Sequence, residues 1–310
     1  MMDHVHNTYK FPSHTGTTEI FVQTLAPANP ADVKGVVQLA HGMAEHTDRY
    51  LDVASFLCDH GYAVIMNDHA GHGRSVKTDD DNGFFCEKDG YKKVVDDVYE
   101  VTKLAKKIYP GKKIILWGHS MGSFIARSFI AKYKNAVDAA IICGTAGANP
   151  AAGVGIALAN LCAKVKGPKA KVKLLDTIAF GTYNKRFQGN TGFEWLSVNE
   201  ENVAKYVADP KCGFLFTTSG FRDLFSVLKS VSGPDWYRAV PADMKLYLIA
   251  GEDDPVGNYG KGVTEVYDKL KESGHTNVSI KLYKGLRHEI HNEKSNAEVY
   301  NDILAFAESI

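Results

Sequence analysis

Residues 113–122 read Lys-Ile-Ile-Leu-Trp-Gly-His-Ser-Met-Gly, and they predict a strand that turns sharply into a helix. Its first half is an apolar, β-prone run, and a helix-like run from Met121 to Tyr133 follows the serine. A serine between two glycines at a strand-to-helix junction is typical of a nucleophile elbow. The turn is so tight that side chains flanking the serine would collide, so glycine is needed on both sides, at positions 118 and 122. The serine hydroxyl then lies exposed beside a helix N-terminus, whose free N–H groups stabilise negative charge.

Predicted strands alternate with predicted helices along most of the chain. The strands are Ile20–Thr24, Val36–His41, Ala63–Asp68, Lys113–Gly118, Val137–Gly144, Met244–Ala250 and Val278–Tyr283, and the helices are Arg49–His60, Tyr91–Tyr109, Met121–Tyr133, Tyr259–Ser273 and Ser295–Ile310. The strands are continuous apolar runs, which is expected of a sheet covered on both faces. The pattern predicts an α/β fold with a mostly parallel central sheet flanked by helices.

The alternation breaks between about Ala146 and Val240, where small apolar residues, lysines and aromatic clusters replace it. We therefore predict a core formed by residues 1–145 and 241–310, interrupted by a mainly helical cap at 146–240. The aromatic side chains of this insertion either line an acyl channel or pack the cap onto the core. Its lysines between 164 and 173 either meet anionic lipid head groups or form a solvated face.

Composition excludes several classes of protein. The 310 residues contain 36 Lys+Arg and 36 Asp+Glu, so no global field favours nucleic acid. The five cysteines are scattered and odd in number, which predicts reduced thiols and neither a zinc site nor a disulfide framework. The N-terminus is polar, and no run of about 18 apolar residues occurs. We expect a cytoplasmic protein without an integral membrane segment.

A nucleophilic serine needs a general base that is oriented by a carboxylate. Asp254 and His288 each follow a predicted strand, at the sheet edge where α/β active sites form. Asp254 is a better candidate than Asp253, because Pro255 biases the residue before it toward an extended conformation. The sequence thus offers the chain order serine, acid, histidine that such elbows use.

His288 competes with His291 for the role of base. His288 comes first after the strand, whereas His291 either lines the pocket or caps the following helix. The metal-binding helix signature His-Glu-x-x-His is absent, and no third ligand is evident, so we expect no metal.

An oxyanion hole needs two convergent backbone donors. The N–H of Met121, directly after the nucleophile, is one candidate. The loop His-Gly-Met-Ala-Glu-His at 41–46 follows a predicted strand, and its small Gly42 permits close backbone approach. Met43 is therefore the second predicted donor.

Five motifs occur in a fixed order in this chain: His-Gly-Met-Ala-Glu-His at 41–46, Asp-His-Ala-Gly-His-Gly-Arg-Ser at 68–75, Gly-His-Ser-Met-Gly at 118–122, Gly-Glu-Asp-Asp-Pro-Val at 251–256 and Arg-His-Glu at 287–289. Together they resemble the monoacylglycerol lipase and lysophospholipase branch of the α/β hydrolases, which is also labelled serine aminopeptidase-like. The resemblance spans nearly the whole chain and implies the α/β-hydrolase fold with a helical cap.

The resemblance also implies roles for individual residues. Ser120, Asp254 and His288 match the family's nucleophile, acid and base, and Met43 and Met121 match its oxyanion donors. Glu45, Arg49 and His291 match positions near the polar glycerol end of the lipase pocket, although a surface salt bridge between Glu45 and Arg49 is an alternative. Ala44 departs from the family pattern, which has glycine there.

These observations predict a serine hydrolase that cleaves a small acyl ester of the monoacylglycerol or lysophospholipid type, without a cofactor. Its substrate is the one partner we expect, apart from transient contact of the cap with a membrane surface; the sequence does not define the oligomeric state. An aminopeptidase or amidase that uses the same triad is the first alternative, but no acidic site for a substrate amine is marked. A non-catalytic binding protein of the same fold is the second, and the presence of all three triad residues argues against it.

Overall fold

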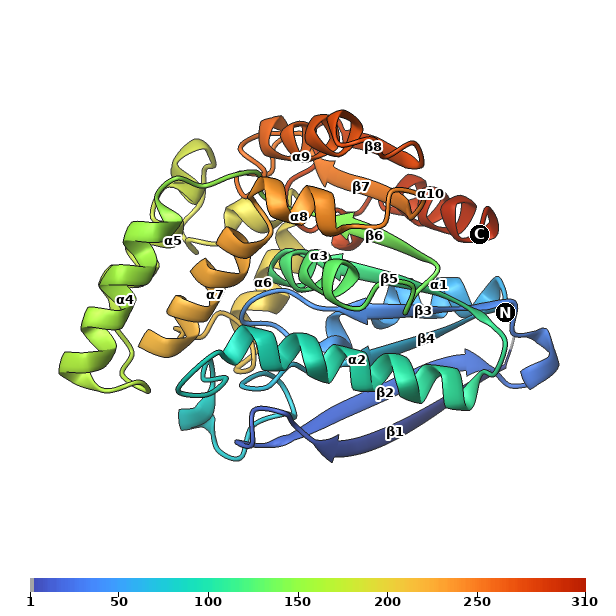
Figure 1. Ribbon diagram of the computed structural model, residues 1–310, viewed down its shortest axis with the longest axis horizontal. Coiled ribbons are helices and arrows are strands. Elements are labelled where there is room, and N and C mark those ends of the chain that lie inside the picture. The colour runs from blue at the N-terminus through green and yellow to red at the C-terminus, as the bar shows by residue number, and fades with distance from the viewer. Residues whose placement is uncertain (1–2) are drawn as a thin grey trace.

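The computed structural model describes residues 3–310, and a single eight-stranded sheet runs through it (Figure 1). The strand order is β1-β2-β4-β3-β5-β6-β7-β8, and every neighbouring pair from β4 to β8 is parallel. The strands are β1 (His4–Pro12), β2 (Glu19–Pro27), β3 (Gly35–Ala40), β4 (Tyr62–Asn67), β5 (Lys113–His119), β6 (Ala139–Cys143), β7 (Lys245–Gly251) and β8 (Val278–Tyr283). The predicted α/β class is confirmed.

Strand β1 is the one strand that the sequence pattern did not predict. It pairs antiparallel with β2 along nine residues and forms one edge of the sheet. Most of its residues are exposed or half-buried, because only one neighbour covers it. An edge strand of this kind lacks the continuous apolar run by which buried strands are recognised.

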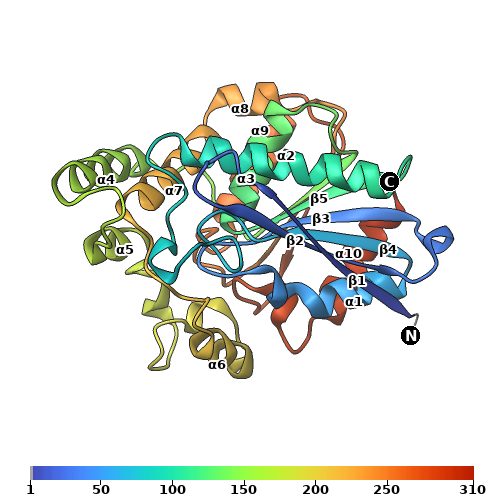
Figure 2. The same ribbon diagram turned by 90° about the horizontal axis from the view of Figure 1, so that it is seen from below.

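Helices cover both faces of the sheet, as Figure 2 shows from below. On one face, α1 (Leu51–Asp59) and α10 (Ala297–Glu308) pack on the apolar cluster around Trp117, Leu39 and Ile249. On the other face, α2 (Gly90–Ile108), α3 (Met121–Lys132) and α9 (Lys261–Glu272) enclose the larger cluster. The alternate side chains of each parallel strand supply the two clusters, which is why these strands read as unbroken apolar runs.

Between β6 and β7 the chain forms α4 (Ala152–Lys166), α5 (Lys173–Phe180), α6 (Glu200–Ala208), α7 (Thr218–Ser230) and α8 (Pro234–Ala239). Helices α4 and α5 lie at the outer end of the molecule, away from both termini (Figures 1 and 2). Phe216, Phe221 and Phe225 are buried in the larger core cluster. These aromatic side chains therefore pack the insertion onto the core, which is one of the two roles that the sequence allows for them.

The predicted helix boundaries shift where the backbone changes conformation. Helix α9 begins at Lys261 and not at Tyr259, because Asn258 and Tyr259 both have positive φ angles, 49° and 57°. L-residues in this left-handed region cannot continue a helix.

The structure also describes the cysteines and the length of the apolar helices. All five cysteines are free thiols, and four of them are buried. Within residues 3–310, no helix is both long enough and apolar enough to span a bilayer.

Candidate active site

Ser120 occupies a strained turn between β5 and α3. Its φ of 54° and ψ of −122° lie outside the regions that L-residues usually adopt, and such strain costs about 1–3 kcal/mol. Neighbouring groups hold the turn: the Ser120 N–H donates to Cys143 O at 3.0 Å, and the Ser123 N–H and hydroxyl both donate to Ser120 O. The surroundings therefore fix a conformation that an isolated chain would avoid.

The two glycines flanking the elbow have no space for a side chain. A Cβ at Gly118 would lie 2.2 Å from Gly122 O, and a Cβ at Gly122 would lie 2.0 Å from Ala40 O. Both distances are far inside van der Waals contact with backbone atoms, which cannot move away cheaply. The sequence argument that glycine is needed on both sides of the serine is confirmed.

Asp254 is fully buried, and both of its carboxylate oxygens accept hydrogen bonds. Oδ1 accepts from the Val256 N–H at 2.9 Å, and Oδ2 accepts from His288 Nδ1 at 2.9 Å. Its neighbour Asp253 is exposed. The turn at Pro255 thus presents Asp254, and not Asp253, to the imidazole.

His288 is 2% exposed and lies among aromatic rings. Its ring is 4.6 Å from that of His119 and 5.1 Å from that of Trp195, which comes from the insertion. Burial disfavours the charged imidazolium, but the neighbouring carboxylates, Asp254 foremost, together raise the pKa of His288 above its ordinary value. The hydrogen bond to Asp254 also orients the imidazole.

The loop after β3 lies directly against the nucleophile. A Cβ at Gly42 would lie 3.1 Å from Ser120 Cβ and 2.6 Å from Glu45 Oε1, so a side chain here would crowd both the nucleophile and the glutamate. The Gly42 N–H donates to Glu45 Oε1 at 2.5 Å, which makes the N–H of Met43 the next donor along the loop. The N–H of Met121 is the first of α3, and the first four N–H groups of a helix have no partner within it.

Ala44 adopts the left-handed conformation, with φ of 52°. Alanine tolerates this region poorly and glycine occupies it freely, so a physical reason exists for glycine at this position of the loop. The Ala44 carbonyl accepts from the Gly213 N–H at 2.9 Å and the Tyr206 hydroxyl at 3.0 Å, and both donors belong to the insertion. The insertion thus holds the loop in its strained form.

Glu45, Arg49 and His291 lie close together, in the interior. Arg49 donates to Glu45 Oε2 at 3.1 Å, so the ion pair that was one of the two alternatives from the sequence is present. It is buried and does not lie on the surface. His291 is fully buried and stacks on Tyr50, with ring centroids 4.7 Å apart. Neither of its ring nitrogens has a hydrogen-bond partner among residues 3–310.

Two groups of side chains have the composition of metal ligands. His119, Cys143 and His291 are all buried behind the elbow, and His46, Asp209 and Cys212 join the loop after β3 to the insertion; in each group the ligand atoms lie within 4.8 Å of one another. In the second group His46 and Asp209 already share a hydrogen bond of 2.8 Å.

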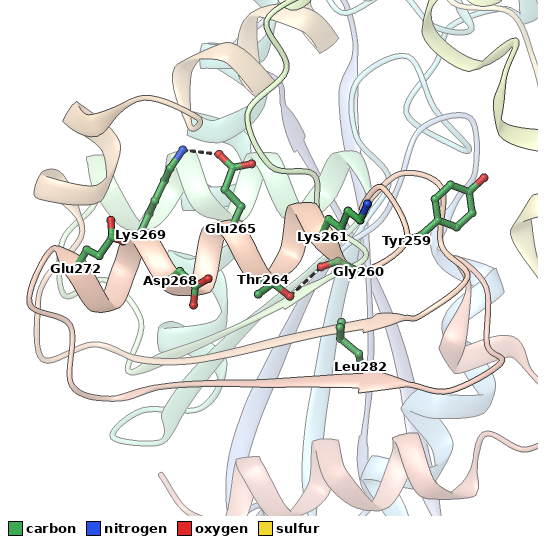
Figure 3. A pocket seen from close by; sticks show the side chains of 9 residues that line it. All are labelled: Tyr259, Gly260, Lys261, Thr264, Glu265, Asp268, Lys269, Glu272 and Leu282. Atoms are coloured by element: carbon green, nitrogen blue, oxygen red, sulfur yellow. Dashed lines mark hydrogen bonds and ion pairs between the residues drawn. The ribbon is translucent and has the colours of Figure 1, made fainter.

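A separate groove lies along α9 and the edge strand β8 (Figure 3). Thr264 in this groove donates to the Gly260 carbonyl, and Lys269 pairs with Glu265. None of the lining residues belongs to the predicted triad, and the groove has no histidine beside a nucleophile. The groove therefore contains none of the predicted catalytic residues.

A strained serine, a buried acid–histidine pair and a glycine loop at one sheet edge define the class of α/β hydrolases. The family model described as serine aminopeptidase, S33, matches residues 31–295. The chain belongs to this family.

The individual relatives include esterases and lipases. A monoacylglycerol lipase of Mycolicibacterium smegmatis is 30% identical over 284 residues, which cover 89% of this chain and 88% of that one. The human monoglyceride lipase is 27% identical, covering 87% and 80%. A thermostable carboxyl esterase from Bacillus coagulans, solved in complex with glycerol, has a TM-score of 0.92 at 29% identity and covers 99% of both chains.

Proposed function

We propose that this protein is a serine esterase that cleaves a monoacylglycerol or a lysophospholipid. The observation that carries the proposal is the hydrogen bond of 2.9 Å between His288 Nδ1 and Asp254, at the same sheet edge as the strained Ser120. The relationship to monoacylglycerol lipases and to a glycerol-bound esterase supports the substrate class.

In the proposed mechanism, His288 takes the proton of Ser120 as the hydroxyl attacks the ester carbonyl. Asp254 holds the imidazole in the tautomer that accepts at Nε2 and stabilises the imidazolium that forms. The N–H groups of Met43 and Met121 bind the oxyanion, and a water molecule, activated by His288, then releases the acid. No step calls for a cofactor.

The substrate class is tested by comparing an ester with an amide. We expect hydrolysis of a medium-chain monoacylglycerol and of a lysophospholipid, with kcat/KM at least about 100-fold above that for an aminoacyl-anilide. An aminopeptidase needs an unpaired acid to hold the substrate amine, whereas the buried carboxylates of Glu45 and Glu289 are both bonded to Arg49. Titration of released acid measures the first two substrates, and released aniline measures the third. Faster cleavage of the anilide would overturn the ester assignment and favour the amidase alternative.

We also propose that the outer part of the insertion touches membranes. Large apolar side chains on α4 and α5 are more than half exposed: Val154, Leu161, Val165, Leu174 and Ile178. Lysines lie among and between them, at positions 164, 166, 169, 171 and 173. Exposed apolar groups beside cationic side chains favour an anionic lipid surface.

This contact is tested by co-sedimentation with vesicles. We expect binding to vesicles that contain phosphatidylglycerol, weaker binding to pure phosphatidylcholine, and a loss of roughly tenfold in the double variant Leu161→Ser/Val165→Ser. Val198→Ser, at another exposed apolar residue of the insertion, is the matched control. Equal binding of both variants would contradict a docking surface on α4.

A further inference from the structure

We propose that Glu289 is a positioning residue of this hydrolase: its buried carboxylate joins the base loop, the loop beside Ser120 and helix α6 into one unit through Arg49. This inference rests on the proposed function, because it assigns Glu289 a role toward His288 and the oxyanion loop. Glu289 belongs to the Arg-His-Glu motif at 287–289, but nothing in the sequence assigns it a role of its own, since a glutamate is usually solvated.

Glu289 binds Arg49 through both of its carboxylate oxygens. Glu289 directly follows His288 and is 2% exposed. Its two oxygens accept from Arg49 Nη1 at 2.5 Å and Nη2 at 2.6 Å, which is a bidentate pair. Asn202 Nδ2 of α6 donates to the same carboxylate at 2.7 Å.

A chain of contacts connects Arg49 to the nucleophile. Arg49 also donates to Glu45 Oε2 at 3.1 Å, and Glu45 Oε1 accepts from the Gly42 N–H and from the Tyr50 hydroxyl. Gly42 in turn lies against Ser120. The chain of contacts from the residue after the base to the loop beside the nucleophile is therefore continuous.

Arg49 and Glu289 also contact the insertion. Arg49 Nη2 donates to Asn202 Oδ1 at 3.0 Å, and its guanidinium lies 4.7 Å from the ring of Tyr206, whose hydroxyl holds the Ala44 carbonyl. The Glu289 N–H donates to Leu196 O at 2.7 Å. The 194–213 part of the insertion is thus built into the site, so Glu289 links three segments that are distant in the sequence.

The cluster also has an electrostatic consequence. One cation faces two carboxylates, so a net negative charge lies buried next to the base. The titratable or charged groups around His288 are Asp254 after β7, His119 at the end of β5, Glu45 and Arg49 from the loop after β3, and Glu289 and His291 from its own segment. Burial lowers the pKa of His119 and His291, the latter to about 3, so both are neutral.

The carboxylates around His288 all favour its imidazolium form. Asp254 acts most strongly, and Glu289 and then Glu45 also raise the pKa of His288 against the cost of burial. Removing the Glu289 charge makes the imidazolium less favourable, so the His288 titration midpoint moves to lower pH.

The test replaces Glu289 by its neutral isostere and observes His288 directly. In Glu289→Gln, we expect the ¹³Cε1 NMR titration of His288 to move down by about half a pH unit or more. The acid limb of kcat/KM should move the same way, and kcat should fall about 10- to 100-fold with a smaller change in KM. The His288 signal is assigned by its absence from His288→Gln.

Glu293→Gln is the matched control, because Glu293 is 1% exposed and also accepts from the insertion, at Ser197, Val198 and Asn199. We expect its His288 midpoint to stay at the wild-type value. If Glu289→Gln does not fold, Glu45→Gln replaces it, with a smaller downward movement expected.

An unchanged midpoint in the folded Glu289→Gln variant, or an equal movement in Glu293→Gln, would overturn the proposal. The NMR readout does not depend on turnover. Failure of wild-type protein to hydrolyse any ester would overturn the proposed function, whereas an unmoved midpoint in an active variant would overturn only the role of Glu289.

Discussion

Ser120→Ala loses hydrolysis of p-nitrophenyl butyrate by a factor of about 10⁴ to 10⁶, because removing a triad nucleophile leaves only the oxyanion site and substrate binding. The substitution deletes one oxygen from a turn that is held by backbone contacts to Cys143 and Ser123. The variant should therefore fold with a thermal midpoint close to that of the wild type. Initial rates at saturating substrate measure the effect.

Ser295→Ala is the control for this substitution. Ser295 is exposed and precedes α10, so its replacement leaves the rate unchanged. Turnover by folded Ser120→Ala within about tenfold of the wild type would rule out Ser120 as the nucleophile.

Asp254→Asn lowers kcat by about 10⁴-fold while the structure stays intact. The aspartate accepts from His288 Nδ1, and an asparagine amide at this position would donate to it instead. The imidazole would then carry its proton on the nitrogen that should accept from the serine. Steady-state kinetics with p-nitrophenyl butyrate measure the loss.

Asp253→Asn provides a control one residue away. Asp253 is exposed, and its backbone N–H donates to Leu286 O, a contact that the substitution keeps. Its kcat should equal that of the wild type. A larger loss in Asp253→Asn than in Asp254→Asn would mean that the acid had been assigned to the wrong residue.

The sequence predicts the local geometry of the elbow well, because sterics leave few choices there. Gly118 and Gly122 are required by backbone atoms within 2.2 Å of any added Cβ. The positions of the buried parallel strands along the chain follow from apolar runs that are long enough to recognise. Asp254 could be separated from Asp253 because Pro255 restricts only the residue before it.

Features that depend on distant contacts could not be predicted in this way. Strand β1 is visible only through its pairing with β2. From the sequence, Glu45 and Arg49 could equally form a surface salt bridge, whereas in the structure Arg49 also binds Glu289, 240 residues further along the chain. The sequence does not show how the insertion contacts the site either, because Tyr206 donates to the Ala44 carbonyl only in the folded chain.

In the proposed mechanism, Ser120 carries the acyl group. The most direct measurement is mass spectrometry of wild-type protein after reaction with a fluorophosphonate, followed by peptide mapping of the adduct. We predict one adduct per chain, on Ser120, and none in Ser120→Ala. An adduct on another residue, or no adduct on protein that hydrolyses esters, would contradict the assignment.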